Sequence, residues 1–531
     1  MNEYIITLFF NSCIKLTTAV VAVSLCRFAF LKLKYIAGLL LIPWSFYGFL
    51  VWVREYNTGF FSTYAGEKMM NILGSHITLL YFFSNKVMVL CTLVAVVCTI
   101  FKSFNKDKKN THGTASFLSA FRTKKILSKK YGGLILDGIN KRLSEKTSFQ
   151  NCLVCAPTGV GKTQTFILPN LVKINGQSVV VTDPSGELYN SCYLYLESKG
   201  YTVLSIEPYS DKPNYYFNPL QDIKTVSDAK KVAKTLTHQV ESSGDPYWHI
   251  AAASLLSGVL MVCRDLTKLY KDKKYLSFKT LKEYLILSEE ELNIILAEDY
   301  ISDQTRVELK SALMGSEELL SSVKSIALSA IELFSDEHFE KITSQHTLDL
   351  RTLRHKKTAL FIKVPEHKIK LSAPFLSLLY SQLFDVLLDE PKGLPVFILL
   401  EEFANIGKIP DFAQIITTSR KRNVSISLII QEIDQIEKRY KGDLETIISG
   451  GCLTKIFYAG LGVKTAKYVA DLCGKMTQES SSTTSQKEKV SETESEIGRY
   501  LLNPDEIRRI ALNEAIVVHG NQQPIKLKIT P

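Results

Sequence analysis

One stretch decides the fold of this chain: Ala156-Pro157-Thr158-Gly159-Val160-Gly161-Lys162-Thr163. A short apolar segment, residues 152–155, precedes it, and a pattern typical of a helix, residues 164–173, follows it. Glycines allow the backbone between a strand and a helix to curl until successive N–H groups point at phosphate oxygens, and the helix adds the positive end of its dipole. The sequence therefore predicts a site for the phosphates of a nucleotide.

The side chains of this loop have distinct expected roles. We expect Lys162 to neutralise the β- and γ-phosphates and the Thr163 hydroxyl to ligate Mg²⁺. Ala156 stands where the pattern G-x-x-x-x-G-K-[ST] has its first glycine, and alanine fits there only with a negative φ. The alternative is a glycine-containing turn that binds nothing. The residues expected to contact the phosphates are Thr158, Gly159, Val160, Gly161, Lys162 and Thr163.

Composition limits the possible partners and compartments. The 531 residues are enough for three or four units, and the 46% hydrophobic content is high for a soluble protein and indicates membrane segments. The net charge of +11 favours an anionic partner, either nucleic acid or a lipid surface. Of the ten cysteines, Cys152 and Cys155 form a CxxC pattern inside an apolar segment, without a second pair nearby. We expect free buried thiols there rather than a metal or redox site.

Three apolar runs open the chain, at residues 4–31, 35–53 and 76–101. The second run carries no charge and is long enough to cross a hydrocarbon core of ~30 Å. The first run contains Lys15 and Arg27, so its span is less clear. The sequence predicts a membrane anchor of two or three transmembrane helices within residues 1–104. The alternative is a buried pair of helices in a soluble domain.

Basic residues orient the predicted spans. Lysines and arginines lie between the first two runs and after the third, whereas charges in the 54–75 loop balance. The positive-inside rule then places that loop outside and the bulk of the chain in the cytoplasm. Residues 102–130 are strongly basic, with Asp107 as their only acid. Binding to anionic lipid headgroups explains this segment at least as well as binding to DNA.

Short apolar strands alternate with helical patterns in the remaining chain, which predicts an α/β fold with a parallel sheet covered on both faces. Ligands of such sheets bind beyond the carboxyl ends of the strands. Residues 222–350 interrupt the alternation with helical patterns only and predict an all-α insertion. Within it, Tyr247 and Trp248 are either packing anchors or base-stacking residues. Residues 477–496, rich in Ser, Thr, Glu and Lys, predict a flexible loop.

The apolar strand 396–400 ends in two carboxylates, Glu401 and Glu402. We expect Glu401 to hold the Mg²⁺ shell and Glu402 to orient and deprotonate the attacking water. The usual first acid is aspartate, so Glu401 is one methylene longer. The alternative is a pair of solvated carboxylates that follow a core strand.

Polar residues flank the strand 424–430. Gln431, directly after it, is placed to sense the γ-phosphate or to position the water. Before it stands a basic triplet, Arg420-Lys421-Arg422. Arg420 or Arg422 is suited to enter a neighbouring subunit's site as an arginine finger, to contact DNA phosphates, or to form a solvated turn. The sequence leaves these three alternatives open.

Taken in order, these motifs resemble the VirD4/TraG family of type IV secretion coupling proteins, the membrane-anchored ATPases of conjugation. The most specific matches are the Glu402–Pro410 run, Glu-Phe-Ala-Asn-Ile-Gly-Lys-Ile-Pro, and the Asp245–Trp248 segment, Asp-Pro-Tyr-Trp. The other matching pieces are the N-terminal runs, Ala156–Thr163, Thr182–Tyr189, Phe217–Leu220, Gln431 and Leu502–Ile507.

The resemblance implies a RecA-like P-loop NTPase domain, residues 105–221 and 351–531, around an all-α domain, residues 222–350. It implies ATP and Mg²⁺ as cofactors and a homo-hexamer around a central channel in the bacterial cell membrane. Its expected partners are single-stranded or duplex DNA, relaxase proteins and secretion channel components. Lys162 and Thr163 take the phosphate and Mg²⁺ roles, Glu401 and Glu402 form the acidic pair, Gln431 is the sensor and Arg420 the finger.

Three functional hypotheses follow. The leading one is an ATP-driven coupling protein that recruits a DNA–relaxase complex to a type IV secretion channel and promotes its translocation. A DNA translocase of the FtsK type has similar spans and a similar motor, but the helical insertion with Asp-Pro-Tyr-Trp argues against it. The third is a docking receptor that binds nucleotide with little hydrolysis.

Overall fold

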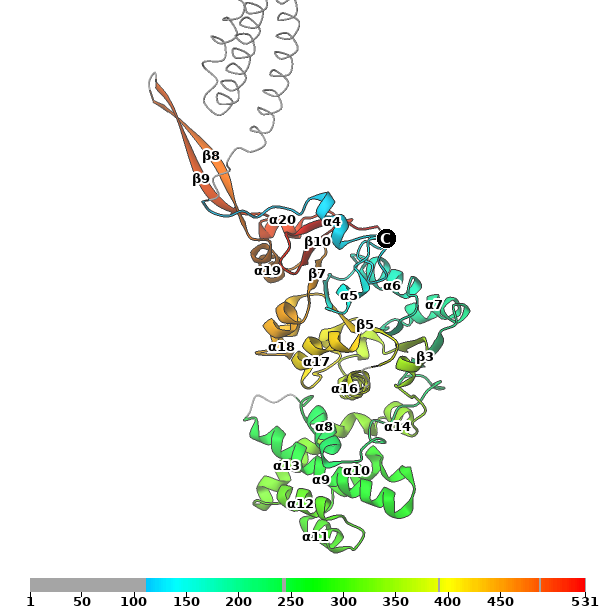
Figure 1. The fold of residues 1–531 in the computed structure, drawn as a ribbon. Helices are drawn as coiled ribbons and strands as arrows, with labels where there is room; N and C mark the ends of the chain where they lie inside the picture. Colours follow the sequence, from blue (N-terminus) through cyan, green and yellow to red (C-terminus); the bar gives the residue numbers. More distant parts are fainter. Residues whose placement is uncertain (1–110, 241–244, 390–391, 487–488, 531) are drawn as a thin grey trace, which may run out of the picture. The chain divides into compact units, whose positions relative to one another are not determined.

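Figure 1 shows the chain as a computed structural model, which describes residues 111–530 apart from 241–244, 390–391 and 487–488. The predicted membrane anchor, residues 1–104, lies outside the described residues. Within the described part, α9 (Tyr247–Tyr270) is the one helix long and apolar enough to cross a bilayer. However, 72% of its apolar window is buried inside the protein, which identifies α9 as a core helix.

Nine strands form the central sheet, in the order β11-β10-β7-β1-β6-β5-β2-β4-β3. The seven strands from β1 to β7 pair in parallel, which confirms the predicted α/β class. The strands are β1 (Cys152–Cys155), β2 (Ser178–Thr182), β3 (Thr202–Ile206), β4 (Thr358–Ile362), β5 (Val396–Leu400), β6 (Val424–Ile430), β7 (Thr454–Phe457), β10 (Glu514–His519) and β11 (Ile525–Lys528).

The sheet is mixed, whereas the sequence predicted a parallel one. β10 pairs antiparallel with both β7 and β11. Only a short turn, residues 520–524, separates β10 from β11, and so short a connection permits antiparallel pairing only.

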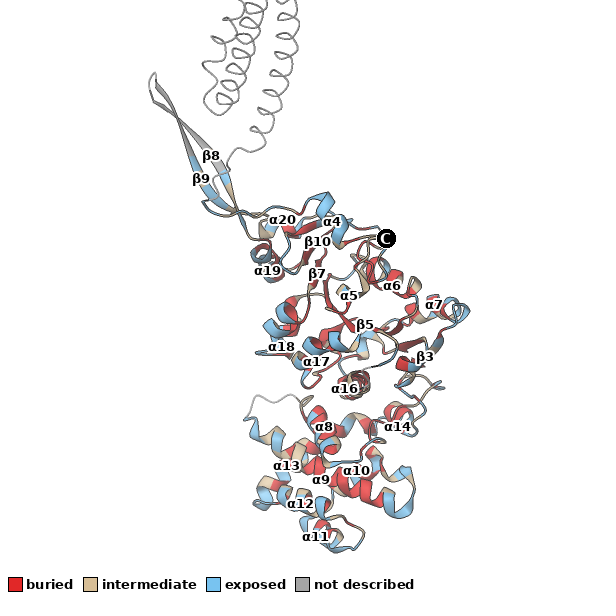
Figure 2. Ribbon diagram, viewed as in Figure 1, coloured by how far each residue is buried: buried red, intermediate tan, exposed pale blue. Residues whose placement is uncertain are grey.

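Alternate residues of each inner strand face two different hydrophobic clusters. In β1, Leu153 and Cys155 pack on the face covered by α16 (Ala373–Asp389) and α19 (Val463–Cys473). Cys152 and Val154 pack on the opposite face against α6 (Leu168–Val172) and α7 (Glu187–Ser198). Because both faces are covered, nearly every residue of these strands is buried (Figure 2).

Register places the functional ends of three strands together. Cys155, the last residue of β1, lies opposite Ile430 of β6, and β6 also pairs with β5. β6 therefore lies between the strand that precedes the phosphate loop and the strand that precedes the acid pair. The remaining helices of this domain are α4 (Ala120–Ile126), α5 (Glu145–Ser148), α15 (Thr352–His355), α17 (Phe412–Thr418), α18 (Ile433–Arg439) and α20 (Pro504–Arg508).

Between β3 and β4 the chain forms the all-α segment seen in green in Figure 1. Serine side chains accept backbone N–H bonds at several of its helix starts, which explains where these helices begin. Trp248 packs against the hydrophobic core, whereas Tyr247 is 47% exposed. The helices are α8 (Val226–Thr237), α9, α10 (Phe278–Leu285), α11 (Glu289–Ala297), α12 (Asp303–Ala312), α13 (Glu317–Ile331) and α14 (Glu337–Thr343).

Residues 475–486 and 489–500 form a pair of antiparallel strands, where the sequence predicted a flexible loop over 477–496. β8 (Lys475–Gln486) pairs with β9 (Lys489–Tyr500) along its whole length. The prediction was based on the scarcity of apolar side chains. Backbone pairing satisfies N–H and C=O groups without an apolar core, and the threonines of this segment favour extended backbone.

Candidate active site

The loop between β1 and the following helix has the conformation that a phosphate site requires. Gly159 and Gly161 have φ values of 82° and 84°, in the left-handed region that favours glycine. Ala156 is not among the residues with positive φ, and its N–H donates to the Ile430 carbonyl at 2.9 Å, continuing β1 along β6. A side chain is therefore tolerated at position 156, which explains the departure from the glycine pattern.

Thr165 holds the loop to the helix below it. Its N–H and its hydroxyl both lie 2.8 Å from the Gly161 carbonyl oxygen. The Tyr458 hydroxyl, at the carboxyl end of β7, lies 2.9 Å from the Thr165 hydroxyl. Residues 163–167 form a π-helical turn, and Pro169 lacks the N–H that an α-helical turn would use to bond the Thr165 carbonyl.

The two predicted acids lie directly against the loop. Glu401 accepts a hydrogen bond from the Thr163 hydroxyl at 3.2 Å, and Glu402 accepts one from the Lys162 ammonium at 2.5 Å. Lys162 Nζ is also 4.0 Å from Glu401 Oε1. Both carboxylates are buried, so the solvated-carboxylate alternative is wrong.

Glu402 has a second set of partners. The Gln431 side-chain amide donates to its two oxygens at 3.1 and 3.3 Å, and the Asn405 amide donates to Oε2 at 3.3 Å. The sequence motifs predicted no role for Asn405. Its spacing was the available signal, because residues 403–405 form one 3₁₀ turn, which brings a side chain three positions on back toward its start.

Burial raises the pKa of the Glu401 carboxyl to about 7. The charge of Lys162 and the bond from Thr163 oppose this rise, whereas the neighbouring Glu402 and Asp183 add to it. Burial also raises the pKa of Asp183, although backbone N–H groups at the start of α7, those of Tyr189 and Leu188, lower it in part.

Two buried carboxylates, Glu401 and Glu402, thus share the Lys162 ammonium, and the charge of Asp183 also acts on Glu401. A divalent cation would compensate this excess of negative charge. The Thr163 hydroxyl and the Glu401 carboxylate are hard oxygen ligands, and Mg²⁺ is commonly held by one or two such groups together with waters and phosphates. The residues present therefore fit Mg²⁺ with a nucleotide.

The structure does not bring Arg420 to this site within one chain. Arg420 belongs to the turn Ser419–Arg422 at the amino end of β6, whereas Gln431 follows the carboxyl end of the same strand. It is exposed and donates to the Gln150 side chain at 3.1 Å.

Cys152 and Cys155 are free and buried, which confirms the prediction for the CxxC pattern. Burial raises the pKa of both thiols well above the ordinary value, so they stay protonated near neutral pH. Among the described residues, no group of three or more His, Cys, Asp and Glu side chains is arranged to hold a metal ion.

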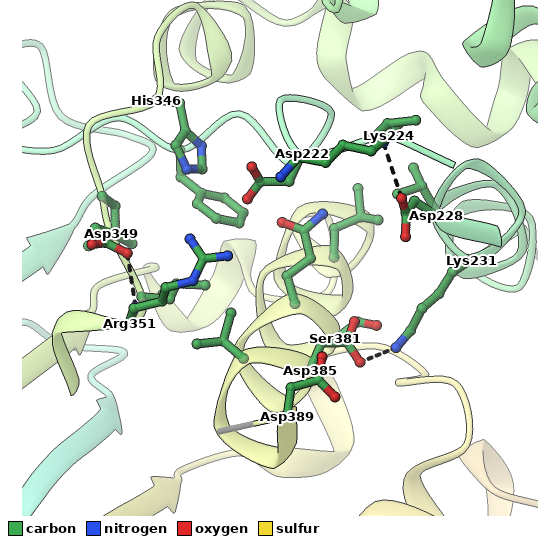
Figure 3. A pocket seen from close by; sticks show the side chains of 18 of the residues that line it. Asp222, Lys224, Asp228, Lys231, His346, Asp349, Arg351, Ser381, Asp385 and Asp389 are labelled. Atoms are coloured by element: carbon green, nitrogen blue, oxygen red, sulfur yellow. Dashed lines mark hydrogen bonds and ion pairs between the residues drawn. The ribbon is translucent and has the colours of Figure 1, made fainter. Parts of the chain in front are cut away.

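A cavity of about 580 Å³ lies away from this site, between α8 and α16 (Figure 3). Lys231 pairs with Asp385 across it, and Arg351 and His346 also line it. No residue of the phosphate loop or the acid pair lines this cavity. The candidate active site is instead formed by the phosphate loop and the carboxyl ends of the central strands β1, β5 and β6.

Comparison with known proteins gives consistent results. Residues 118–529 match the family described as type IV secretory system conjugative DNA transfer. Protein VirD4 of Rhizobium radiobacter is 23% identical over 71% of this chain and 56% of its own length. Conjugal transfer protein TraG of Escherichia coli is 26% identical over 68% of this chain and 62% of its own length. The chain therefore covers less than two thirds of the length of these relatives.

Solved structures of the plasmid coupling protein TrwB have the same fold. The complex of TrwB with ADP and Mg²⁺ superposes with a TM-score of 0.60 at 16% identity, covering 78% of this chain and 93% of TrwB. Its complex with the ATP analogue ADPNP gives a TM-score of 0.58, covering 80% and 94%. With the family match over residues 118–529, the chain belongs to the type IV secretion coupling proteins of the VirD4/TraG family.

Proposed function

We propose that this protein is a membrane-anchored, ATP-driven coupling protein that recruits a DNA–relaxase complex to a type IV secretion channel and promotes its translocation in conjugation. Family membership supports the conjugative role. The complexes of TrwB with ADP and Mg²⁺ and with ADPNP support ATP and Mg²⁺ as its ligands. The observation that carries the enzymatic part is the direct contact of both acids with the phosphate loop, Glu401 with Thr163 and Glu402 with Lys162.

The residues divide the work as follows. Thr163 and Glu401 would hold Mg²⁺, while Lys162 and the N–H groups of residues 158–163 would bind phosphate oxygens. ATP supplies the γ-phosphoryl group that is transferred to water. Lys162 donates to Glu402 in the nucleotide-free chain, and a shift of its ammonium toward phosphate oxygens would free a Glu402 oxygen to take the proton of the attacking water. The hydrogen bonds from Gln431 and Asn405 keep the Glu402 carboxylate in its orientation while Lys162 contacts the phosphates.

The proposal includes the assembly. Residues 1–104 anchor the chain as a multi-pass protein of the bacterial cell membrane, with the bulk of the chain in the cytoplasm. Residues 105–221 and 351–531 form the nucleotide-binding domain and residues 222–350 the all-α domain of a homo-hexamer around a DNA channel. Arg420 precedes the amino end of β6, whereas Lys162 lies beyond the carboxyl end of β1, so within one chain the two residues lie at opposite ends of the strands. Arg420 therefore acts as an arginine finger only in a neighbouring copy.

Turnover and mating assays test this function. We expect the full-length chain in lipid nanodiscs to hydrolyse ATP faster with DNA, and Lys162→Ala to abolish both turnover and plasmid transfer. Lys173→Ala is the matched control, because Lys173 lies at the end of α6 and donates to the Ile139 carbonyl outside the site.

The alternatives predict other results. Nucleotide binding without turnover would favour the docking receptor. DNA-stimulated turnover combined with undiminished plasmid transfer by Lys162→Ala would favour a translocase of the FtsK type and refute the coupling role.

A further inference from the structure

Gln239, a residue of the all-α domain, forms hydrogen bonds with the backbone just beyond the acid pair. Gln239 follows α8, and its side-chain amide makes two bonds to the Lys408 backbone: the Lys408 N–H donates to Oε1 at 3.0 Å, and Nε2 donates to the Lys408 carbonyl at 2.9 Å. Nε2 also donates to the Thr235 carbonyl at 2.9 Å, which fixes the side chain against α8. Residues 403–410, here called the acid-pair loop, are thereby tied to the insertion domain.

The surroundings of the bonds between Gln239 and Lys408 are tightly packed. Gly407 has a φ of 104°, and a Cβ there would lie 2.4 Å from the Ser377 hydroxyl and 2.8 Å from the Gln239 side-chain oxygen. Ser377 belongs to α16, so α16, the segment after α8 and the acid-pair loop meet at this glycine. On the other side, the Ile409 N–H donates to the buried Tyr440 hydroxyl at 3.1 Å. Side chains from outside the loop therefore hold two of its successive peptide groups.

The conformation of Glu402 depends on this loop. Glu402 has a φ of 55°, which costs a non-glycine residue about 1 kcal/mol or more and persists only where the surroundings enforce it. The Asn405 N–H donates to the Glu402 carbonyl at 2.8 Å, closing a turn that ends two residues before Gly407. The next residue, Phe403, is buried and stacks on Tyr440 with ring centroids 5.5 Å apart. Few backbone torsions are therefore free to change between Glu402 and Lys408, the residue that Gln239 holds.

We propose that Gln239 is a positioning residue for Glu402. By bonding to the Lys408 backbone, Gln239 fixes the orientation of the Glu402 carboxylate. The rate of turnover therefore depends on how the all-α domain packs against the sheet. This proposal rests on the proposed function, in which Glu402 takes the water proton. Gln239 bonds to the Lys408 backbone and to its own helix, and no bond joins it to the phosphate loop. It therefore affects the proton-transfer step rather than nucleotide affinity.

The test is Gln239→Met in the full-length chain, which keeps side-chain length and removes the paired bonds. We expect kcat to fall about tenfold to a hundredfold, while KM and Kd for ATP with Mg²⁺ stay within about twofold, since a misplacement near 1 Å costs about that much in rate. Gln239→Asn, one methylene too short to span the gap, provides a second variant with the same expected split. Gln221→Met is the control, because the Gln221 amide donates to the Lys273 carbonyl of the all-α domain at 3.3 Å and not to the acid-pair loop.

Unchanged kcat in both Gln239 variants, or kcat and Kd changing together in both, would overturn the positioning role while the unmodified chain still hydrolyses ATP. Absence of turnover in the unmodified chain would instead refute the proposed function, and the positioning role with it.

Discussion

We predict that binding of ATP with excess Mg²⁺ at pH 6 releases a proton from Glu401, and that Glu401→Gln abolishes this release. Burial, Glu402 and Asp183 raise the pKa of the Glu401 carboxyl to about 7, against the opposing effects of Lys162 and Thr163. Mg²⁺ binds the ionised carboxylate. Its binding therefore displaces the proton wherever the carboxyl is still protonated.

The pKa sets the size and sign of the effect. With a pKa of about 7, about nine tenths of the Glu401 carboxyls are protonated at pH 6 and about one tenth at pH 8. Proton release should therefore be close to one per site at pH 6 and small at pH 8.

The same pKa links pH to folding stability. The folded value lies above the ordinary 4.5, so Glu401 supports the nucleotide-free fold fully below pH 4.5 and loses that contribution as the pH rises through 7. At about 1.4 kcal/mol per pH unit, the free energy of unfolding should fall by about 3 kcal/mol across this range. Glu401→Gln should remove this slope.

Isothermal titration calorimetry in two buffers of different ionisation enthalpy measures the protons released on binding. The difference between the unmodified chain and Glu401→Gln isolates this carboxyl, because protons released by ATP itself cancel. Equal release by both proteins at pH 6, or a larger difference at pH 8 than at pH 6, would refute the reasoning.

Two further predictions concern the scaffold. Asp265→Ala should lower the free energy of unfolding by about 3–5 kcal/mol, because Asp265 accepts bonds from buried Arg264 at 2.6 and 3.0 Å and its loss leaves that guanidinium without a counter-charge. Urea denaturation checks this, and a loss below about 1 kcal/mol would contradict it. Ala156→Gly, which restores the usual glycine, should leave nucleotide affinity unchanged and reduce stability by about 0.5–1 kcal/mol, because position 156 does not need a positive φ. Fluorescent nucleotide titration checks the affinity, and tighter binding would count against this account of the loop.

Much of the site was predictable because a strand buried on both faces excludes charged and amide side chains until it emerges. The first polar residues after β5 and β6 are Glu401 and Gln431, and both lie at the edge where the phosphate loop begins. Arg420 precedes β6, so the same argument places it at the amino ends of the strands, away from the phosphate loop. That outcome was available from chain order alone.

Other features depended on pairing between distant segments. The hairpin of β8 and β9 has almost no apolar pattern to indicate it, and its regularity comes from backbone pairing along two strands. The paired bonds between Gln239 and Lys408 join residues 169 positions apart, and nothing in either local sequence marks them.

The sequence by itself determined that an apolar strand leads into a glycine loop with Lys162 and Thr163, and that two acids end a second strand, because local chemistry and burial control both. Only the tertiary structure decided that β6 lies between those strands, so that Gln431 reaches Glu402 and the acids reach the loop. Strand order depends on how the whole sheet packs against its helices, and no local pattern encodes it.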